Sequence, residues 1–497
     1  MKTRPALDAD AAYRALQARD ARLDGHLFVG VTSTGVYCRP ICRVRTPRRE
    51  NCRFFDTPAQ AEAAAFRPCL KCRPEIAPGA GLAWSVMDAS RTLALQAAQW
   101  LNVNAHAFDD AEAPSLAALA RHLGVSDRHL RRIFAAEHGV TPSQYVQTRR
   151  LLLAKQLLTD TSMPVAQVAH ASGFRSLRRF NAAFAENYRL SPSRLRRDGA
   201  GTSAGAGDGA CATLAFREPY AQGAMLRFLA QRAIPGVEHV DGLCIRRTLR
   251  PGAITGQGGW IEAEFVADRA QLRLRSSASL IAATGALLPA VRRWLDLDAD
   301  PQIIDQALQG LPGDAGLRLP ASVDAFELAV RAVLGQQVTV AAARTLARRL
   351  ALRFGEPVAT PWPELDRWFP APDVVARLEV SQVAELGIIR SRAAAVIGLA
   401  QTWPELQALL RAPASPQPLL ERLCAVPGIG PWTAHYIAMR ALGWADAFPP
   451  GDVAVLNALG LGRGARDVRE ADARSQAWRP WRSYAVLKLW NSLEKSP

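Results

Sequence analysis

The sequence predicts a multidomain protein that is mainly α-helical and contains α+β parts. Its 497 residues are too many for a single hydrophobic core. Alternating apolar and polar residues between 213 and 297 predict strands around a helix near 225–233, whereas helical spacing dominates 84–197 and 301–497. A Gly/Ala/Ser-rich, almost uncharged stretch at 199–210 predicts a flexible linker.

These changes in composition divide the chain into five consecutive segments. The first holds most of the cysteines among short extended stretches, and the second is helical. We expect a small α+β domain at 1–78, a helical domain at 84–197, the linker at 198–211, an α+β domain at 212–299 and an all-α domain at 300–497.

The charge of the chain indicates a polyanionic partner. Lys and Arg total 61 against 45 Asp and Glu, which gives a net charge of +16 and a pI near 10.1. The excess is mostly arginine, whose guanidinium binds phosphate through paired hydrogen bonds. Nucleic acid is therefore the first partner to expect, although a merely soluble basic protein would have the same charge. Without a secretion signal or a long apolar run, we expect a cytoplasmic, nucleoid-associated protein with no membrane partner.

Four cysteines form a pattern typical of a zinc site. Cys38 and Cys42 make one close pair, Cys69 and Cys72 make a second, and twenty-six residues separate the pairs. Each pair can span one edge of a tetrahedron, and the loop brings the two edges together. Cys52 lies between the pairs without a partner at ligand spacing. The spacing alone also fits a purely structural zinc site.

The residues around these cysteines make 1–75 similar to the N-terminal domain of the Ada methyl-response regulators. The matching motifs are Tyr37-Cys38-Arg39-Pro40-x-Cys42-Arg43-x-Arg45, Arg49-Glu50-Asn51 and Phe66-Arg67-Pro68-Cys69-x-x-Cys72. The resemblance implies that Cys38, Cys42, Cys69 and Cys72 bind one Zn²⁺ ion. It also implies that Cys38 accepts a methyl group from a methylphosphotriester in DNA.

This implied chemistry agrees with the properties of thiolates. Zinc keeps a bound thiol deprotonated at neutral pH, so the ion is both structural and activating. Four thiolates leave the site with two net negative charges, and methylation of Cys38 removes one of them. We expect Arg39, Arg43 and Arg45 then to attract DNA phosphate with less opposition. The transfer is stoichiometric, because a thioether does not readily return its methyl group.

Two similar helical units follow the cysteine segment. Each has an apolar helix, a glycine turn and a second, serine-capped helix, the first over 115–137 and the second over 165–187. The exposed face of each second helix is basic, and its arginines are Arg128, Arg131 and Arg132 in the first unit and Arg175, Arg178 and Arg179 in the second. The pair resembles the AraC-type DNA-binding domain, which implies that these arginines contact promoter DNA in the major groove. One such unit alone would fit a solvated basic face equally well.

The most specific motif of the chain is a hairpin followed by an acidic residue. Pro427-Gly-Ile-Gly430 lies between two helical stretches, and Asp452 follows about twenty positions later. Gly428 and Gly430 let backbone N–H groups approach a DNA phosphate at a helix N-terminus. A hairpin with a spaced Asp is typical of the helix-hairpin-helix base-excision glycosylases, whereas the hairpin alone could be structural.

The rest of the C-terminal half resembles the AlkA-type 3-methyladenine glycosylases. The matching motifs include 316–320, 324–336 and 478–485, and the strand-rich part at 212–299 is similar to a half-repeat of TATA-binding proteins. The resemblance covers 213–497. It implies the activity of a DNA-3-methyladenine glycosylase type II, with Asp452 as the catalytic carboxylate.

The resemblance also assigns roles around Asp452. Trp432, Tyr436 and Trp490 match an aromatic pocket that would stack a flipped, electron-poor alkylated base. A lysine stands at the position of Trp432 in the lyase-type relatives, so we expect a monofunctional enzyme that forms no Schiff base. Gln337 stands where the archetype of the family has a leucine wedge, so it would fill the vacated base stack differently.

The sequence therefore predicts a protein that senses and repairs alkylated DNA. The expected partners are alkylated duplex DNA, promoter DNA and RNA polymerase, and the expected state is a monomer. Two alternatives stay open: a transcription regulator whose C-terminal half only binds DNA, and a glycosylase with a purely structural zinc module. No Pro-Cys-His-Arg motif is present, so a domain that accepts methyl from O6-methylguanine is not expected.

Overall fold

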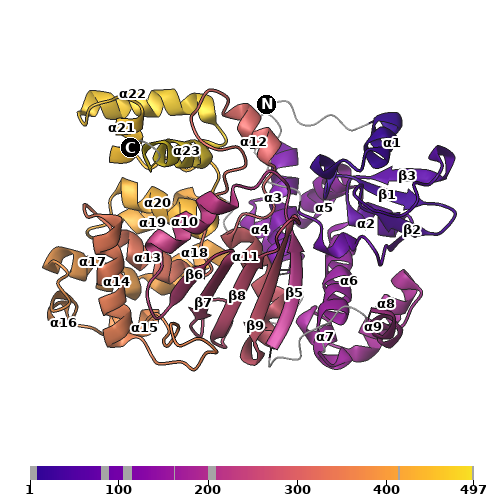
Figure 1. Ribbon diagram of the computed structural model, residues 1–497, viewed down its shortest axis with the longest axis horizontal. Helices are drawn as coiled ribbons and strands as arrows, with labels where there is room; N and C mark the ends of the chain where they lie inside the picture. Colours follow the sequence, from indigo (N-terminus) through magenta and orange to yellow (C-terminus); the bar gives the residue numbers. More distant parts are fainter. Residues whose placement is uncertain are drawn as a thin grey trace. The chain divides into compact units, whose positions relative to one another are not determined.

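The computed structural model describes residues 8–79, 89–104, 115–161, 163–199, 209–411 and 415–494 (Figure 1). The chain forms two compact units. Unit 1 comprises Met1–Glu218, Asp268–Pro289 and Leu297–Ala299, and unit 2 comprises Pro219–Ala267, Ala290–Asp296 and Asp300–Pro497. In the described part of the chain, no helix is long and apolar enough to cross a membrane.

Unit 1 begins with an N-terminal module, residues 8–79, built on a four-stranded sheet of order β3-β1-β2-β4. Its elements are α1 (Ala9–Gln17), η1 (Ala21–Leu23), β1 (Phe28–Val31), β2 (Val36–Cys38), η2 (Arg49–Asn51), β3 (Cys52–Phe55), α2 (Pro58–Ala63), β4 (Arg67–Pro68) and η3 (Pro74–Ile76). Because side chains alternate along a strand, Val29 packs with Leu16 on one face and Phe28 packs with Tyr37 on the other. The β2 strand ends at Cys38, at the start of the cysteine-bearing loops.

The next helices of unit 1 contain two helix-turn-helix units. The elements are α3 (Ala89–Asn104), α4 (Leu116–His122), α5 (Asp127–His138), α6 (Pro142–Asp160), α7 (Val165–Ala171), α8 (Leu177–Tyr188) and α9 (Pro192–Gly199). The hydroxyl oxygens of Ser126 and Ser176 accept backbone N–H bonds at the starts of α5 and α8, so both predicted caps are confirmed. Residues 84–88 of the expected helical domain lie outside the described residues.

Buried charges fix the N-terminal module on helix α6 within unit 1. Lys155 Nζ lies 2.5 Å from a carboxylate oxygen of Glu75, and both side chains are almost fully buried. Arg73 lies 2.7 Å from Asp160, at the end of the same helix. Breaking such a pair leaves an uncompensated buried charge, so the contact specifies one arrangement of module and helix.

Strand β5 (Gly209–Ala215) begins within the expected linker. Residues 200–208 of that linker lie outside the described residues, but 209–211 belong to β5, which pairs antiparallel with β9 (Gln271–Ser277). A Cβ atom added at Gly209 would lie 1.8 Å from the Ser276 carbonyl oxygen. The small residues at this end of the stretch therefore allow a close approach of two backbones. The 3-10 helix η4 (Ala278–Ala283) comes directly after β9.

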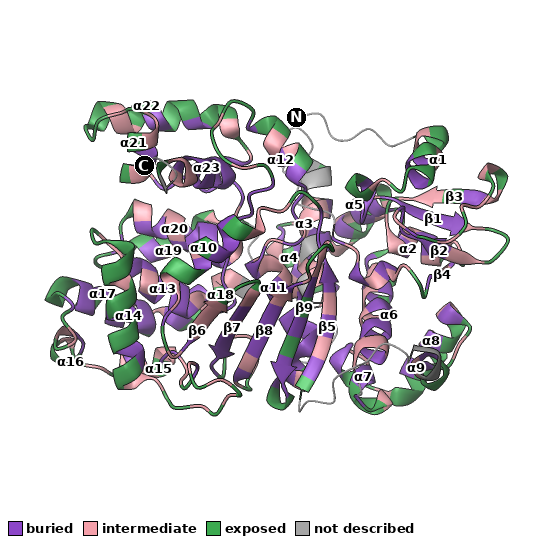
Figure 2. Cartoon of the chain, viewed as in Figure 1, coloured by how far each residue is buried: buried purple, intermediate pink, exposed green. Residues whose placement is uncertain are grey.

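Unit 2 combines an antiparallel strand group with a helical domain (Figures 1 and 2). Strands β6 (Glu238–Asp241), β7 (Cys244–Leu249) and β8 (Gly259–Phe265) pair in that order. The helices are α10 (Gln222–Arg232), α12 (Pro301–Ala307), α13 (Ala325–Leu334), α14 (Val340–Phe354), α15 (Pro372–Ala376), α16 (Val380–Ala384), α17 (Arg390–Gln401), α18 (Trp403–Arg411), α19 (Gln417–Cys424), α20 (Pro431–Leu442), α21 (Val453–Ala458), α22 (Ala465–Ser475), η5 (Gln476–Trp478) and α23 (Arg482–Glu494). Helix α11 (Thr284–Trp294) runs through the boundary of the units.

Helix α13 is the centre of the helical domain. Eight of its ten residues are buried, and it packs against α14, α17 and α20. Its two ionisable side chains, Glu327 and Arg331, join Glu238 and Arg247 in a buried network with charged contacts of 2.6–2.8 Å. The network is electrically balanced, which allows four charges to stay in a protein core. It holds the strand group and the helices of unit 2 together.

Candidate functional sites

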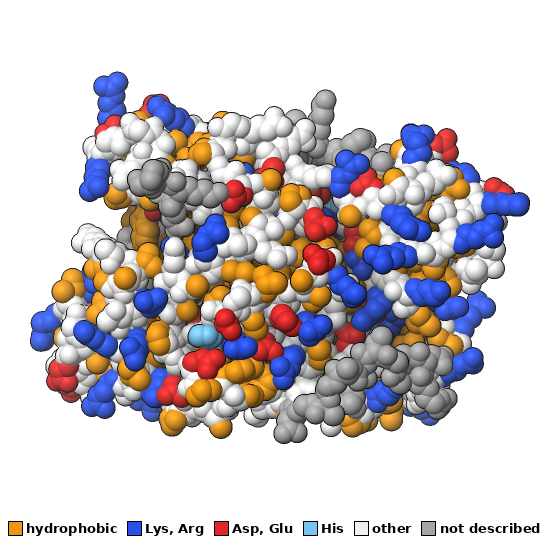
Figure 3. Space-filling model, in the orientation of Figure 1, with side chains coloured by type: hydrophobic (Ala, Val, Ile, Leu, Met, Phe, Trp, Pro, Cys, Tyr) orange, Lys and Arg blue, Asp and Glu red, His pale blue; other side chains and the backbone are white. Residues whose placement is uncertain are grey.

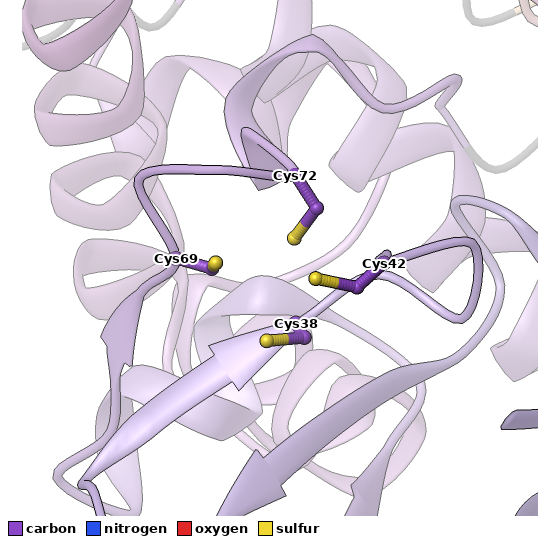
Figure 4. Close-up of side chains that lie close together, drawn as sticks. All are labelled: Cys38, Cys42, Cys69 and Cys72. Atoms are coloured by element: carbon purple, nitrogen blue, oxygen red, sulfur yellow. The ribbon is translucent and has the colours of Figure 1, made fainter. Parts of the chain in front are cut away.

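The four predicted cysteines lie together in unit 1. Figure 4 shows their side chains pointing toward one another, with Cys38 at the end of β2 and the others on loops. Their sulfur atoms all lie within 4.8 Å of one another. The module fixes the loops by backbone hydrogen bonds, because the Cys69 N–H donates to the Tyr37 carbonyl at 2.9 Å.

The cluster fits a tetrahedral zinc ion. Zn–S bonds of about 2.3 Å place sulfur atoms about 3.8 Å apart, which agrees with the observed grouping. The Arg39 backbone N–H donates to Cys72 Sγ at 3.3 Å, as expected for a thiolate that accepts hydrogen bonds. Cys52 lies outside the cluster, in β3.

The arginines near the cluster divide into one buried and two exposed residues. Arg39 is 3% exposed, and its guanidinium is paired with Asp24 and donates to the Cys72 carbonyl at 3.1 Å. The expectation that Arg39 meets DNA phosphate therefore needs correction, because a side chain held in this way braces the Cys72 loop. Arg43 and Arg45 are exposed, as phosphate binding requires.

The predicted DNA-contacting arginines of the two helix-turn-helix units all lie on exposed helix faces or at helix starts. The exposed residues are Arg128, Arg131, Arg132, Arg175, Arg178 and Arg179. Apolar residues on the opposite faces of α5 and α8, such as Phe134 and Phe180, are fully buried. Figure 3 shows further Lys and Arg side chains over the N-terminal module of the same unit. This distribution offers unit 1 a basic surface for nucleic acid.

In unit 2, the glycine hairpin between α19 and α20 presents backbone groups to solvent. Gly428 has φ +88°, a conformation that favours glycine, and an added Cβ would lie 2.8 Å from the Ala395 Cβ. Gly430 is the N-cap of α20, is exposed and has no side-chain cap. An exposed helix N-terminus without a side-chain cap can bind an anion through its N–H groups.

A neighbouring loop carries the predicted wedge residue. Gln337 is exposed with φ +54°, a backbone conformation that is uncommon outside glycine. The side chain before it, Gln336, donates to the Gly428 carbonyl at 3.0 Å and to the Thr433 hydroxyl at 2.9 Å. Gln336 therefore ties the loop of Gln337 to the hairpin, a role that sequence reasoning did not assign.

The Asp452 carboxylate lies between two indole rings. It caps helix α21, where Oδ1 accepts the Val455 N–H at 2.9 Å. Trp490 Nε1 donates to Oδ1 at 3.0 Å, and Trp432 Nε1 donates to Oδ2 at 2.9 Å. Asp452 is 6% exposed, and in the part of the chain that the structure describes no Lys or Arg pairs with it. Neutral donors thus hold the carboxylate in place without neutralising its charge.

Three helices deliver these side chains to one point. Trp432 lies in the first turn of α20, Asp452 precedes α21 and Trp490 lies in α23. The segment between α20 and α21 is fastened to α23, because Asp446 binds the Arg482 Nε at 2.7 Å. The Ser483 N–H also donates to the Ala445 carbonyl at 2.9 Å. These contacts bring Trp490 within reach of Asp452.

Tyr436 completes the aromatic cluster beside Asp452. Its ring stacks on Trp432 with centroids 5.3 Å apart and planes 13° apart, and it lies 6.3 Å from Trp490. Arg440, one helical turn on, donates to the Tyr436 hydroxyl at 2.8 Å. Burial alone would raise the pKa of Tyr436, but the nearby arginines, Arg440 first, lower it below its usual value. Sequence reasoning missed Arg440, although its spacing of four residues from Tyr436 was a usable signal.

The fold and the two sites define a multidomain DNA-binding protein with a four-cysteine metal site and a helix-hairpin-helix DNA glycosylase fold. Family models match in the same order. They are the metal binding domain of Ada at 11–75, a helix-turn-helix domain at 119–198, the AlkA N-terminal domain at 211–324 and the HhH-GPD superfamily base excision DNA repair protein at 330–483.

Known proteins resemble the whole chain as well as its parts. A probable bifunctional transcriptional activator/DNA repair enzyme AlkA of Mycobacterium tuberculosis is 37% identical over 98% of this chain and 97% of its own length. DNA-3-methyladenine glycosylase 2 of Escherichia coli is 37% identical over 56% of this chain and 96% of its own length. The bifunctional transcriptional activator/DNA repair enzyme Ada of E. coli is 30% identical over 34% of this chain and 44% of its own length.

The chain belongs to the family of bifunctional Ada/AlkA-type transcriptional regulators and DNA repair enzymes. The predicted fold class and the predicted family are both confirmed. The chain combines an Ada-type metal-binding domain with a four-cysteine cluster, a helix-turn-helix domain and a DNA glycosylase domain.

Proposed function

We propose that the C-terminal half hydrolyses the N-glycosidic bond of alkylated bases in DNA, such as 3-methyladenine, with Asp452 as the catalytic carboxylate. The observation that carries this proposal is a nearly buried carboxylate held by three N–H donors and by no cation within the described residues. Positive charge develops on the sugar as the base leaves. A fixed carboxylate that keeps its charge stabilises that transition state.

The reaction needs few groups, because an alkylated, cationic base is already a good leaving group. The bond between the sugar C1′ and the base nitrogen breaks, and its electron pair leaves with the base. Water then adds to C1′ and loses a proton, with the Asp452 carboxylate orienting it and accepting that proton. Trp432 occupies the position where a lyase needs an amine, so no Schiff base forms and the product is an abasic site.

The aromatic side chains define where the base is held. A base needs about 3.5 Å on each of its faces, so the 5.3 Å between Trp432 and Tyr436 leaves no room between these two rings. We infer that the flipped base stacks on the open face of this pair, toward Trp490. An electron-rich face attracts an electron-poor alkylated base, as in a cation–π contact. The hairpin amides of Gly428 and Gly430 bind a backbone phosphate, and Gln337 enters the vacated stack.

Base release by an Asp452→Asn variant tests the glycosylase proposal. The amide keeps the size of the side chain but removes its charge, so we expect a loss of about a thousandfold in single-turnover release of 3-methyladenine. Asp373→Asn is the matched control, because that carboxylate is 70% exposed on an ion pair with Arg377. Release by Asp452→Asn at the wild-type rate, or none by the wild type, would contradict the proposal. The second result would favour a C-terminal half that only binds DNA.

For the N-terminal module we propose that one zinc ion binds Cys38, Cys42, Cys69 and Cys72, and that Cys38 accepts methyl from a DNA methylphosphotriester. Bound zinc holds the thiols as thiolates at neutral pH. Cys38 Sγ attacks the methyl carbon, an S–C bond forms and the C–O bond breaks. The phosphodiester leaves as an anion, so atoms and charge balance. Cys38 ends as a thioether and is used once.

Methylation of Cys38 would raise the affinity of the module for DNA. The site loses one negative charge, so the exposed Arg43 and Arg45 bind phosphate with less opposition. The arginines of α5 and α8, with Arg175 just before α8, would then read promoter DNA in the major groove: Arg128, Arg131, Arg132, Arg175, Arg178 and Arg179. We also propose that the promoter-bound protein acts as a monomer and contacts RNA polymerase, as the activator names of its relatives suggest.

Mass spectrometry tests the acceptor proposal. After incubation with DNA that contains methylphosphotriesters, we expect one added methyl group on the peptide of Cys38 and none on that of Cys52, which lies outside the cluster. If the Cys38 peptide gains no methyl group, the acceptor proposal is contradicted and the zinc site is purely structural. Sedimentation velocity and in vitro transcription with and without methylation test the monomer and the contact with RNA polymerase.

A further inference from the structure

Helix α14 of unit 2 carries an exposed row of arginines. The row consists of Arg344, Arg348, Arg349 and Arg353, and the helix contains no Asp or Glu. The opposite face, with residues such as Leu346 and Leu350, is buried in the core of the domain. Figure 2 shows the outer side of α14 as exposed, and Figure 3 shows Lys and Arg side chains over this part of the unit.

The arrangement of the row is unfavourable for a free helix. Arg344 and Arg348 are four residues apart, as are Arg349 and Arg353, and like charges at this spacing repel one another. Across the described residues none of the four takes part in an ion pair, although Arg349 donates to the Leu386 carbonyl at 2.9 Å.

Helix α22 of the same unit mixes its arginines with carboxylates, namely Asp467, Glu470 and Asp472. On α22, Arg474 lies 2.8 Å from Glu470, and Arg377 after α15 is paired with Asp373. Such mixed pairs are typical of an ordinary solvated helix face. The row on α14 differs, because its four exposed arginines stand on a helix that has no carboxylate of its own.

The row continues from the part of unit 2 that we propose faces DNA. Helix α14 is capped by Thr339, two residues after Gln337, and the intervening Val338 and the first helical residue Val340 are 38% and 41% exposed. Arg349 reaches the loop that leads into α17. Residues 337–342 are all exposed and lead directly to Arg344, and Gln336 joins this loop to the hairpin at the Gly428 carbonyl. Wedge loop, hairpin and arginine row are therefore parts of one connected surface.

We propose that the arginine row of α14 binds the sugar–phosphate backbone of undamaged duplex DNA beside the lesion. From Arg344 to Arg353 the helix rises about 14 Å, at 1.5 Å per residue. This length corresponds to about four base steps at 3.4 Å each. Contacts of this kind carry no base information, so the row adds affinity for any sequence and keeps the enzyme on DNA while it searches.

The inference rests on the proposed glycosylase function in one respect: that function says which surface of unit 2 faces DNA. It concerns undamaged DNA, and it requires neither Asp452 nor base release. It names duplex DNA as the partner, since the length of the row fits about four base steps of a regular polyanion. An unchanged salt slope of DNA binding would contradict the proposal and leave the row for another polyanion, such as an acidic protein.

The test measures the salt dependence of DNA binding by the full chain. The Arg344→Gln/Arg348→Gln variant and the wild type are titrated against an undamaged, promoter-free duplex over about 50 to 200 mM KCl. Removal of one phosphate contact lowers the slope of log K against log salt by about 0.9, so we expect a decrease of about 1.8 for the two substitutions. Single-turnover base release at saturating protein stays at the wild-type rate, because the chemistry lies at Asp452.

Two control variants make the outcome specific. Arg377→Gln/Arg474→Gln removes the same charge from arginines that already have carboxylate partners, so its slope stays at the wild-type value. Arg344→Lys/Arg348→Lys keeps the charge and most of the slope, and it remains informative if the glutamine variant does not fold. An unchanged slope for the glutamine variant, or an equal decrease in the Arg377/Arg474 control, overturns the proposal. A wild type that binds DNA normally but releases no base contradicts only the glycosylase proposal.

Discussion

The two candidate sites are built from different lengths of chain and held by different forces. The cysteine cluster takes its four thiols from residues 38–72, at the end of strand β2 and on nearby loops of a small domain. The Asp452 site takes its side chains from three helices, α20, α21 and α23. A metal ion holds ligands on short loops because its bonds are strong, whereas single hydrogen bonds to a carboxylate, of about 1.5–3 kcal/mol, need a rigid packed core behind them.

This difference suits the chemistry proposed for each site. A thiolate that accepts a methyl group is used once, so its surroundings need not return to the starting state. A glycosylase carboxylate must be presented unchanged in every turnover, and the indole N–H groups and the buried contact of Asp446 with Arg482 keep it in place. Three experiments test this difference between the two sites. They remove the metal, change a buried carboxylate of the N-terminal module, and remove one indole donor of Asp452.

Removal of the metal should have the largest effect, and it should be confined to the N-terminal module. Structural zinc contributes about 10–16 kcal/mol to the folding of small zinc modules, so a chelator or Cys69→Ser should abolish hydrogen-exchange protection of β1 and β2. The amides of α20 and α23 should keep their protection, and base release should change by less than about twofold. Cys52→Ser is the control, because Cys52 is not in the cluster. A parallel loss of base release would show that the sites depend on each other.

The same difference explains which parts of the molecule the sequence could predict. The cysteine ligands are close in sequence, so their spacing alone defined the candidate site. The serine caps of α5 and α8 were predictable for the same reason, since a cap depends on a few neighbouring residues. Trp490, thirty-eight residues after Asp452, was found through the resemblance to a family and not through spacing.

Contacts between distant segments could not be predicted from the sequence. Arg39 stands in a basic motif, and only the fold shows that Asp24 lies beside it and buries it. The small residues at 209–211 looked like linker, yet β9 covers them as a strand. The pairs that join the N-terminal module to α6, such as Glu75 with Lys155, are eighty residues apart. Tertiary contacts override local patterns at each of these positions.

The buried carboxyl group of Glu62 should make the stability of the N-terminal module depend on pH. Glu62 accepts the Tyr37 hydroxyl at 3.1 Å, and burial raises its pKa from 4.5 to about 8. Between these pH values the folded module holds a proton that the unfolded chain has lost, so its stability falls as the pH rises. From pH 6 to pH 8 we expect a loss of about 2 kcal/mol, which Glu62→Gln should remove.

Hydrogen exchange of the β1 amides at both pH values, corrected for intrinsic exchange, measures this difference. Glu50→Gln is the matched control, because the side chain of Glu50 is 67% exposed. Its stability should follow the wild type at both pH values. If Glu62→Gln loses as much stability as the wild type between pH 6 and pH 8, the titrating group lies elsewhere. The Asp452 site should show no change in protection from either substitution, because it belongs to the other unit.

Removal of one indole donor should leave the stability of both units unchanged and should act on catalysis alone. Trp490→Phe keeps an aromatic ring for stacking but deletes the N–H that binds Asp452 Oδ1. A hydrogen bond to a charged group contributes about 1.5–3 kcal/mol, so single-turnover base release should slow by about 10- to 150-fold. Trp403→Phe is the matched control, because this buried indole N–H has no acceptor among the described residues. Equal losses of base-release rate in the two variants would mean that the Trp490 ring contributes packing and that its N–H contributes nothing. A loss specific to Trp490→Phe would show that the carboxylate is positioned through its donors.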